Sequence, residues 1–239
     1  YTLANTIDEG TTWISFTPST SSWTQSIPLG DQSLSTKITF RATDAVGNTT
    51  PSDSYVSFSS IKFDTAVPIL VVNESASFNK AGETFTLSGT AQDTLALDRV
   101  VIVPVKDGTT QTSWTYTAAD NLTESKTWSY TLAGTSENNG SWSFTITAYD
   151  KAGRQSSSVV RSVVLDTAEP TLSDVEITTT GFEVGSGEDK KTWYNKAMLA
   201  VTVTAIDNLS GVSIVEYSTD GTSYSSMTKG SLSAWNANV

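Results

Sequence analysis

Apolar and polar residues alternate in short segments along most of this chain. Trp142, Phe144, Ile146 and Ala148 are separated from one another by serine and threonine residues, and residues 38–42 show the same alternation. A period of two places the apolar side chains on one face of a half-buried strand. No segment of useful length shows the periodicity of an amphipathic helix. The pattern therefore predicts an all-β protein.

Two segments of the chain repeat each other. Residues 38–48 read Ile-Thr-Phe-Arg-Ala-Thr-Asp-Ala-Val-Gly-Asn, and residues 144–154 read Phe-Thr-Ile-Thr-Ala-Tyr-Asp-Lys-Ala-Gly-Arg. Each leads to an Asp-Thr-Ala-x-Pro sequence, and the two prolines, Pro68 and Pro170, lie 102 positions apart. Self-similarity at a fixed period indicates an array of one kind of module.

A second internal match gives the limits of the modules. Residues 78–81 (Phe-Asn-Lys-Ala) parallel residues 194–197 (Tyr-Asn-Lys-Ala). We predict that residues 1–67 form the later part of one repeat, that 68–169 form a complete repeat, and that 170–239 form the earlier part of a third. Short strands separated by Gly, Asn, Asp and Ser turns predict a β-sandwich for each complete repeat.

These phrases resemble bacterial immunoglobulin-like (Big-type) repeats, which occur in tandem in large secreted adhesins and surface proteins. The resemblance rests on the Ala-x-Asp-x-x-Gly-Asn/Arg turn, the Asp-Thr-Ala-x-Pro joint, and residues 204–212 leading into 216–221. It implies tandem immunoglobulin-like sandwiches arranged as a rod, outside or on the surface of a bacterial cell. The middle repeat departs from the pattern at Arg154, where the first copy of the turn has Asn48.

The charge of the chain narrows the choice of partners. It has 14 Lys and Arg residues against 25 Asp and Glu, a formal net charge of −11. An acidic surface disfavours nucleic acid and anionic membranes as partners and leaves room for divalent cations. No apolar run approaches the ~18–20 residues of a membrane span, so we predict no membrane insertion in this segment. The absence of cysteine excludes disulfide bonds.

Five aspartates stand where the resemblance places loops and joints. In an immunoglobulin-like sandwich Asp93 falls in the BC loop and Asp150 in the FG loop, at the pole where Asp64 enters. We therefore expect these three to converge, with Asp166 and Asp207 as an equivalent pair at the next joint. Carboxylate oxygens suit Ca²⁺, which takes 6–8 oxygen ligands. One interpretation of these aspartates is therefore structural Ca²⁺ at the joints, and no cofactor is required.

A second interpretation of the same aspartates needs no metal. An Asp side chain in a turn accepts hydrogen bonds from backbone N–H groups a few residues on, and a glycine after it supplies the positive φ that the turn requires. The sequence leaves both interpretations open.

Exposed tryptophan side chains stack on sugars, which makes the tryptophans candidates for a ligand-binding surface. Several of them recur at matching positions of the repeats, which is typical of packing residues: Trp13 and Trp23 in the first repeat, Trp114 and Trp128 in the second. We therefore expect most to lie in cores. Trp193 and Tyr194, beside the Gly-, Lys- and Glu-rich stretch 181–192, are the candidates for ligand binding.

Catalysis has little support in the sequence. The chain has no histidine and no cysteine, which removes the usual general base and the nucleophilic triads. We predict that it is not an enzyme. The expected function is a non-catalytic stalk whose partners are the neighbouring repeats of the same chain, together with a host or surface protein or a glycan.

Two alternatives stay open beside the stalk. One is a subunit of an extracellular filament or sheath that self-assembles by strand or domain complementation, because the outer repeats lack strands and so expose sheet edges. The other is a carbohydrate-binding adhesin module.

Overall fold

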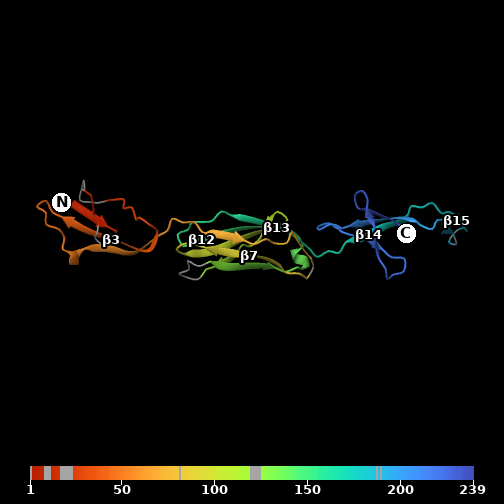
Figure 1. Cartoon of the computed structure of the whole chain (residues 1–239), viewed down its shortest axis with the longest axis horizontal. Coiled ribbons are helices and arrows are strands. Elements are labelled where there is room, and N and C mark those ends of the chain that lie inside the picture. Colours follow the sequence, from red (N-terminus) through yellow and green to blue (C-terminus); the bar gives the residue numbers. More distant parts are fainter. Residues whose placement is uncertain are drawn as a thin grey trace.

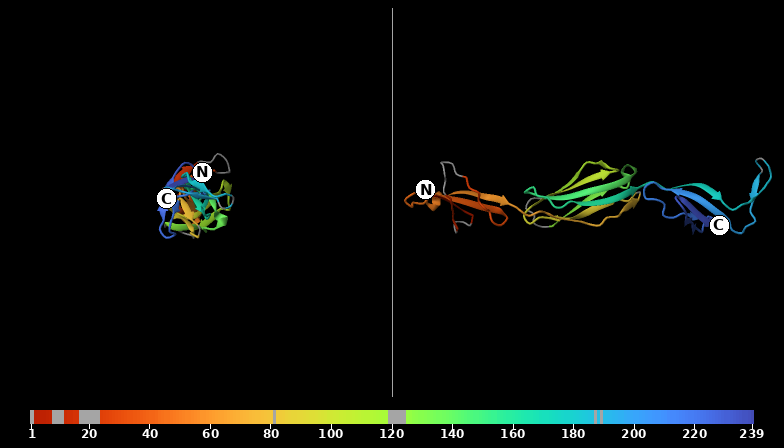
Figure 2. Two further views of the ribbon diagram at one scale, coloured as in Figure 1. Left: turned by 90° about the vertical axis from the view of Figure 1, so that its right-hand side faces the viewer. Right: turned by 90° about the horizontal axis from the view of Figure 1, so that it is seen from above.

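The computed structural model describes residues 2–7, 12–16, 24–80, 82–118, 125–186, 188 and 190–239. The protein is all-β: strands in mainly antiparallel sheets account for its regular structure, with two short 3-10 helices and no α-helix among the described residues. Figure 1 shows three groups of strands that follow one another in chain order, and the right-hand view of Figure 2 shows the same order. No helix in the described part of the chain is long and apolar enough to cross a bilayer.

The first group is one four-stranded sheet in the order β2-β1-β3-β4. Its elements are β1 (Thr2–Thr6), β2 (Ile14–Phe16), β3 (Ser33–Thr43), the 3-10 helix η1 (Ser52–Ser54) and β4 (Val56–Phe63). Ile38 is buried on the long central strand β3, as its alternation predicts, whereas Phe58 on β4 is 63% exposed. This sheet therefore leaves part of its apolar surface uncovered.

The middle group contains two sheets, in the orders β11-β7-β5 and β10-β8-β12-β13-β6. Its elements are β5 (Ile69–Val72), β6 (Phe78–Lys80), β7 (Phe85–Gln92), β8 (Leu97–Lys106), β9 (Thr109–Thr110), β10 (Trp114–Thr117), β11 (Lys126–Leu132), the 3-10 helix η2 (Ser136–Asn138), β12 (Gly140–Asp150) and β13 (Val159–Asp166). The pairing of β13 with β6 is parallel, whereas the other pairs of this group are antiparallel.

The two middle sheets face each other across one apolar core, consistent with a β-sandwich. Phe85 and Leu87 of β7 lie on one side, and Phe144 and Ile146 of β12 lie on the other, all at most 2% exposed. The rings of Phe85 and Phe144 stack at a centroid distance of 5.5 Å. Trp142 lies on the same strand face as Phe144, which confirms the predicted alternation of apolar and polar side chains in this segment.

The third group contains a four-stranded sheet in the order β14-β17-β21-β20 and two short hairpins. Its strands are β14 (Thr171–Ile177), β15 (Phe182–Val184), β16 (Lys191–Trp193), β17 (Ala200–Ile206), β18 (Glu216–Tyr217), β19 (Ser225–Ser226), β20 (Thr228–Lys229) and β21 (Ala234–Asn238). Its buried cluster is small: Val203, Ala205, Val215, Met227 and Trp235. Leu172 and Val175 of β14 remain more than 60% exposed.

The repeated sequence segment, residues 38–48 and 144–154, occupies the same place in two sheets. In the first group β1 lies between β2 and β3, and Leu3 pairs with Ala42. In the middle group β8 lies between β10 and β12, and Val100 pairs with Ala148. Ala42 and Ala148 hold corresponding positions in the repeated segment, and the strands that carry them hold the same place in their sheets, so the internal match of the sequence is also a match of strand order.

Most of the tryptophans pack inside the strand groups. Trp128, Trp142 and Trp235 are buried, as expected for packing residues, and Trp193 is 64% exposed. Trp13 is half-buried with the Arg41 guanidinium 4.0 Å above its ring. Trp114 is partly buried against the middle core. Trp23 lies outside the described residues.

Candidate functional site

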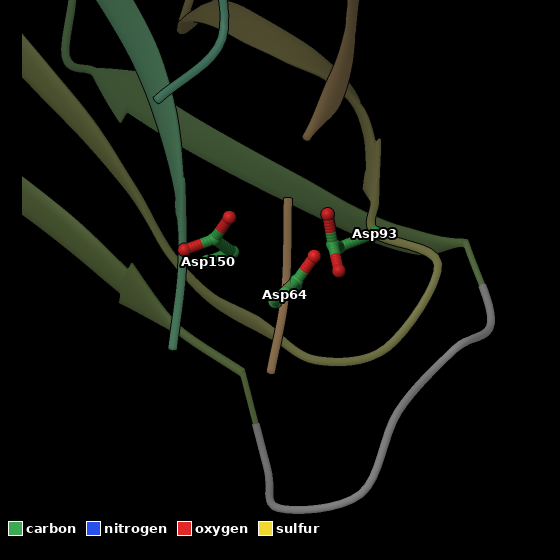
Figure 3. Close-up of side chains that lie close together, drawn as sticks. All are labelled: Asp64, Asp93 and Asp150. Atoms are coloured by element: carbon green, nitrogen blue, oxygen red, sulfur yellow. The ribbon is translucent and has the colours of Figure 1, made fainter. Parts of the chain in front are cut away.

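Three aspartates from separate segments converge at one end of the middle strand group. Asp64 follows β4, Asp93 follows β7, and Asp150 is the last residue of β12. A carboxylate oxygen from each lies within 4.8 Å of one from both others. Figure 3 shows Asp64 between the other two side chains. The convergence predicted for these three residues is therefore present in the structure.

One oxygen of each carboxylate stabilises the turn in which that residue lies. The acceptor is Oδ1 in each case, and the donors are backbone N–H groups: Ala66 to Asp64 at 3.0 Å, Leu95 and Ala96 to Asp93 at 2.9 and 3.0 Å, and Arg154 to Asp150 at 2.8 Å. The turn-capping interpretation is thus correct for one oxygen of each residue.

The remaining oxygens of the two buried residues have no such partner. Asp93 is 3% exposed and Asp150 is 1% exposed, and Oδ2 of each accepts no hydrogen bond. Among the described residues, no lysine or arginine side chain forms an ion pair with any of the three carboxylates. A buried charged group without a partner costs more than the ~1–3 kcal/mol of a neutral one. A positive charge bound beside these oxygens would therefore offset the cost of burying them.

The arrangement suits a hard cation of the size of Ca²⁺. Two ligands on opposite sides of one Ca²⁺ are about 4.8 Å apart, since each Ca–O distance is ~2.3–2.6 Å. One carboxylate oxygen from each of Asp64, Asp93 and Asp150 lies within that limit of the other two. A cavity of about 430 Å³, lined by Leu34, Phe63, Asp64, Leu95 and other residues, lies beside them. Because Asp64 is only half-buried, the cluster is open to solvent on that side.

Two residues link the three segments, and the sequence analysis did not select the first of them, Gln32. Gln32 Oε1 accepts hydrogen bonds from the N–H groups of Thr65 and Ala66 at 3.3 and 3.2 Å, and its Nε2 donates to Thr94 Oγ1 at 2.8 Å. It thereby ties the segment after Asp64 to the residue after Asp93. No motif marks Gln32, because its partners lie 33, 34 and 62 positions away.

Arg154 makes the corresponding link to Asp150. Its backbone N–H donates to Asp150 Oδ1, and its side-chain Nε donates to the Asp64 backbone carbonyl at 3.2 Å. The sequence did mark Arg154 as a departure from the repeated phrase, but the role of this departure needed the position of Asp64.

The cluster changes the titration of its half-buried member. Burial raises the pKa of Asp64 above its ordinary value of 3.8, and the negative charges of Asp93 and Asp150 add to this effect. A carboxyl group whose pKa is higher in the folded than in the unfolded chain contributes stability below the unfolded pKa and loses it as the pH rises through the folded pKa.

We therefore expect Asp64 to make the cation-free protein less stable as the pH rises above 3.8. The measurement is the free energy of unfolding by denaturant at a series of pH values in chelator, for the natural chain and for Asp64→Asn. The advantage of the natural chain over the variant should decline across this range until the pH exceeds the raised pKa. A difference that is constant with pH would show that Asp64 titrates normally.

The aspartates at the second joint are arranged differently. Asp166 is 7% exposed and ends β13; its Oδ1 accepts from Ala168 N–H at 3.0 Å and its Oδ2 from Ser210 N–H at 2.9 Å. Hydrogen bonding to Ser210, opposed by burial, lowers the Asp166 pKa, with Ala168 and Asp207 contributing further. Asp207 Oδ1 caps its own turn through Leu209 and Gly211. In the described part of the chain, no third carboxylate joins this pair in a cluster like the first, and a cation here stays a prediction.

The two candidates for ligand binding lie elsewhere, in the third strand group. Trp193 ends β16, pairs with Phe182 of β15, and is 64% exposed. Tyr194 follows it and is half-buried. The structure makes Trp193 accessible, and its binding of a glycan stays a prediction.

Comparison with known proteins gives no relative for this site. No protein-family model matches the chain, and no curated protein sequence matches it.

Proposed function

We propose that this chain is a non-catalytic, structural segment of a bacterial extracellular or surface protein, in which tandem immunoglobulin-like sandwiches form a rod-like stalk. Calcium bound by Asp64, Asp93 and Asp150 stiffens the joint between the first and second repeats. The function is mechanical: the repeats supply reach, and the joints set the stiffness.

The repeated modules support the structural part of this proposal. The same phrase takes the same sheet position in the first and middle strand groups, and the two are joined by a short segment, residues 64–68. Gln32 and Arg154 hold that segment to both groups. Short joints with side-chain contacts on both sides restrict the relative motion of neighbouring modules.

The single observation that carries the calcium proposal is the pair of buried, unpartnered oxygens on Asp93 and Asp150, beside Asp64. Asp93 and Asp150 belong to the middle group, whereas Asp64 belongs to the joint. A cation held by all three therefore binds the joint to the middle sandwich, and its binding free energy opposes any motion that separates them.

The test compares the chain in millimolar Ca²⁺ with the chain in chelator. Extracellular calcium modules have dissociation constants of ~10⁻⁴–10⁻³ M. At 10 mM Ca²⁺ this corresponds to about 1.4–2.7 kcal/mol of added stability, or a rise in melting temperature on the order of 10 °C for a domain of ~100 residues. Calorimetry should show this rise for one transition, and small-angle scattering should show a longer particle.

Magnesium at the same concentration is the matched control. Its Mg–O distance of ~2.0–2.1 Å and its demand for octahedral geometry fit this cluster less well, so a smaller rise is expected. A melting temperature and a scattering profile that Ca²⁺ leaves unchanged would overturn the calcium proposal.

A further inference from the structure

The chain contains two copies of one turn with the same backbone hydrogen bonds. In the first copy, Asp44 N–H donates to the Asn48 carbonyl at 2.9 Å, and Gly47 N–H donates to the Asp44 carbonyl at 3.3 Å. In the second copy, residues 150–154, the corresponding distances are 3.1 and 3.3 Å. Both turn glycines have positive φ, 98° at Gly47 and 87° at Gly153, which favours glycine at this position. The two turns therefore form an internal comparison in which the side chains differ and the backbone does not.

In the first copy the turn supplies hydrogen-bond donors to both oxygens of its own aspartate. Asn48 Nδ2 donates to Asp44 Oδ2 at 2.7 Å, while Oδ1 of the same carboxylate accepts the N–H groups of Asn48 and Val46 at 2.8 and 3.0 Å. Both oxygens of Asp44 are thus satisfied. The hydrogen bond from the Asn48 side chain is also the largest cause of a lowered Asp44 pKa.

In the second copy the same backbone presents Arg154 instead of Asn48. Its N–H still donates to Asp150 Oδ1 at 2.8 Å, which reproduces the Asn48 contact. Its side chain, however, extends to the Asp64 carbonyl. Asp150 Oδ2 is left without a hydrogen bond in a residue that is 1% exposed.

We propose that residue 154 decides whether this turn can bind a cation: asparagine occupies the second oxygen of the aspartate, and arginine leaves it for Ca²⁺. The inference rests on the calcium site proposed above and deepens it. It explains why Asp150 and Asp44, which share a turn, differ in the availability of their Oδ2 atoms.

Charge and capping act on cation affinity in opposite directions, which makes the role of residue 154 measurable. Replacing arginine by any neutral residue removes a positive charge near the site, and this by itself favours Ca²⁺. An asparagine amide on Asp150 Oδ2 would have to be displaced before that oxygen could bind the ion, and hydrogen bonds to a charged acceptor are among the stronger ones in proteins. Asn and Ala at position 154 should therefore have opposite effects.

The experiment measures Ca²⁺ affinity by isothermal titration and the melting temperature in chelator for the full chain and two variants. Arg154→Asn should bind Ca²⁺ at least about tenfold more weakly, which corresponds to about 1.4 kcal/mol, and should melt at a higher temperature in chelator because Asp150 is capped. Arg154→Ala is the matched control; it removes the positive charge without placing an amide on Asp150 Oδ2, so its affinity should rise, by up to about threefold, with no rise in melting temperature. Arg154 is exposed, and asparagine already occurs in the equivalent turn, so both variants should fold.

Two results would overturn the inference: Arg154→Asn binding Ca²⁺ as tightly as the natural chain, or Arg154→Asn and Arg154→Ala losing affinity equally. A natural chain that binds no Ca²⁺ would overturn the proposed function and the cation part of the inference together. The melting temperature in chelator needs no calcium, so a rise in Arg154→Asn alone would still support capping of Asp150, and no rise would overturn it.

Discussion

Asp150→Asn should abolish the response of the protein to Ca²⁺ and, in chelator, raise its melting temperature. The substitution removes one of three charged ligands, so we expect calcium affinity to fall by about 100-fold or more. The Arg154 N–H keeps its acceptor, because asparagine retains Oδ1. The new amide lies beside the carboxylates of Asp64 and Asp93, where it replaces repulsion with a hydrogen-bond donor. A gain of about 1–2 kcal/mol in the stability of the calcium-free chain is expected.

The matched control is the same substitution in the other copy of the turn, Asp44→Asn. Here the aspartate already accepts the Asn48 amide, so a second amide places two donors against each other. Asp44→Asn should leave the calcium response unchanged and lower the stability of the first strand group. Calorimetry and calcium titration of both variants provide the measurement. Equal effects of the two substitutions, whether on affinity or on melting temperature in chelator, would contradict the roles assigned to the two turns.

Strand β12 of the middle group could be predicted from the sequence because apolar and polar side chains alternate along residues 142–148. Phe144 and Ile146 lie on one face at period two, and a one-residue shift would put both in water. The repeated segment then indicated that β3 and β12 correspond, and the two strands do hold the same place in their sheets. In both cases the information lies within a few residues along the chain.

The meeting of Asp64, Asp93 and Asp150 was predicted only through the resemblance, which supplied a loop arrangement that the residues alone do not encode. The sequence posed turn capping and cation binding as alternatives. The structure shows that the Oδ1 atoms cap the turns, while Oδ2 of Asp93 and of Asp150 stays available. A choice between atoms of one carboxylate depends on local geometry and cannot be read from residue types.

Gln32 and Ser210 show why the rest of the joints escaped prediction. Gln32 contacts Thr94, 62 positions later, and Ser210 N–H satisfies Asp166 from 44 positions away. Gln32 lies in no distinctive pattern, and the segment 204–212, which contains Ser210, does not reveal that the Ser210 N–H reaches Asp166. Contacts of this kind follow from how two strand groups approach each other, which the periodicity within each group does not determine.

Phe144→Ala should cost the middle strand group about 3–5 kcal/mol of stability, a large part of the ~5–15 kcal/mol typical of a whole domain. The Phe144 ring is fully buried and lies between the rings of Phe85, Tyr130 and Trp142, at centroid distances of 5.5, 5.6 and 5.9 Å. Removing it leaves a cavity that the two facing sheets cannot close without shifting. Denaturant unfolding followed by tryptophan fluorescence measures the loss.

Phe58→Ala is the control for loss of an aromatic ring as such. Phe58 is 63% exposed, and its ring lies in a T-shaped arrangement with the ring of Phe40 at a centroid distance of 6.1 Å. Its removal should therefore cost about 1 kcal/mol or less. If Phe144→Ala does not fold, Phe144→Leu should, at a cost of about 1–2 kcal/mol.

Because β12 ends at Asp150, strain in this core reaches the carboxylate cluster directly, and Phe144→Leu should weaken Ca²⁺ binding slightly whereas Phe58→Ala should not. Equal losses of stability at positions 144 and 58 would show that the two middle sheets do not depend on Phe144 for their packing.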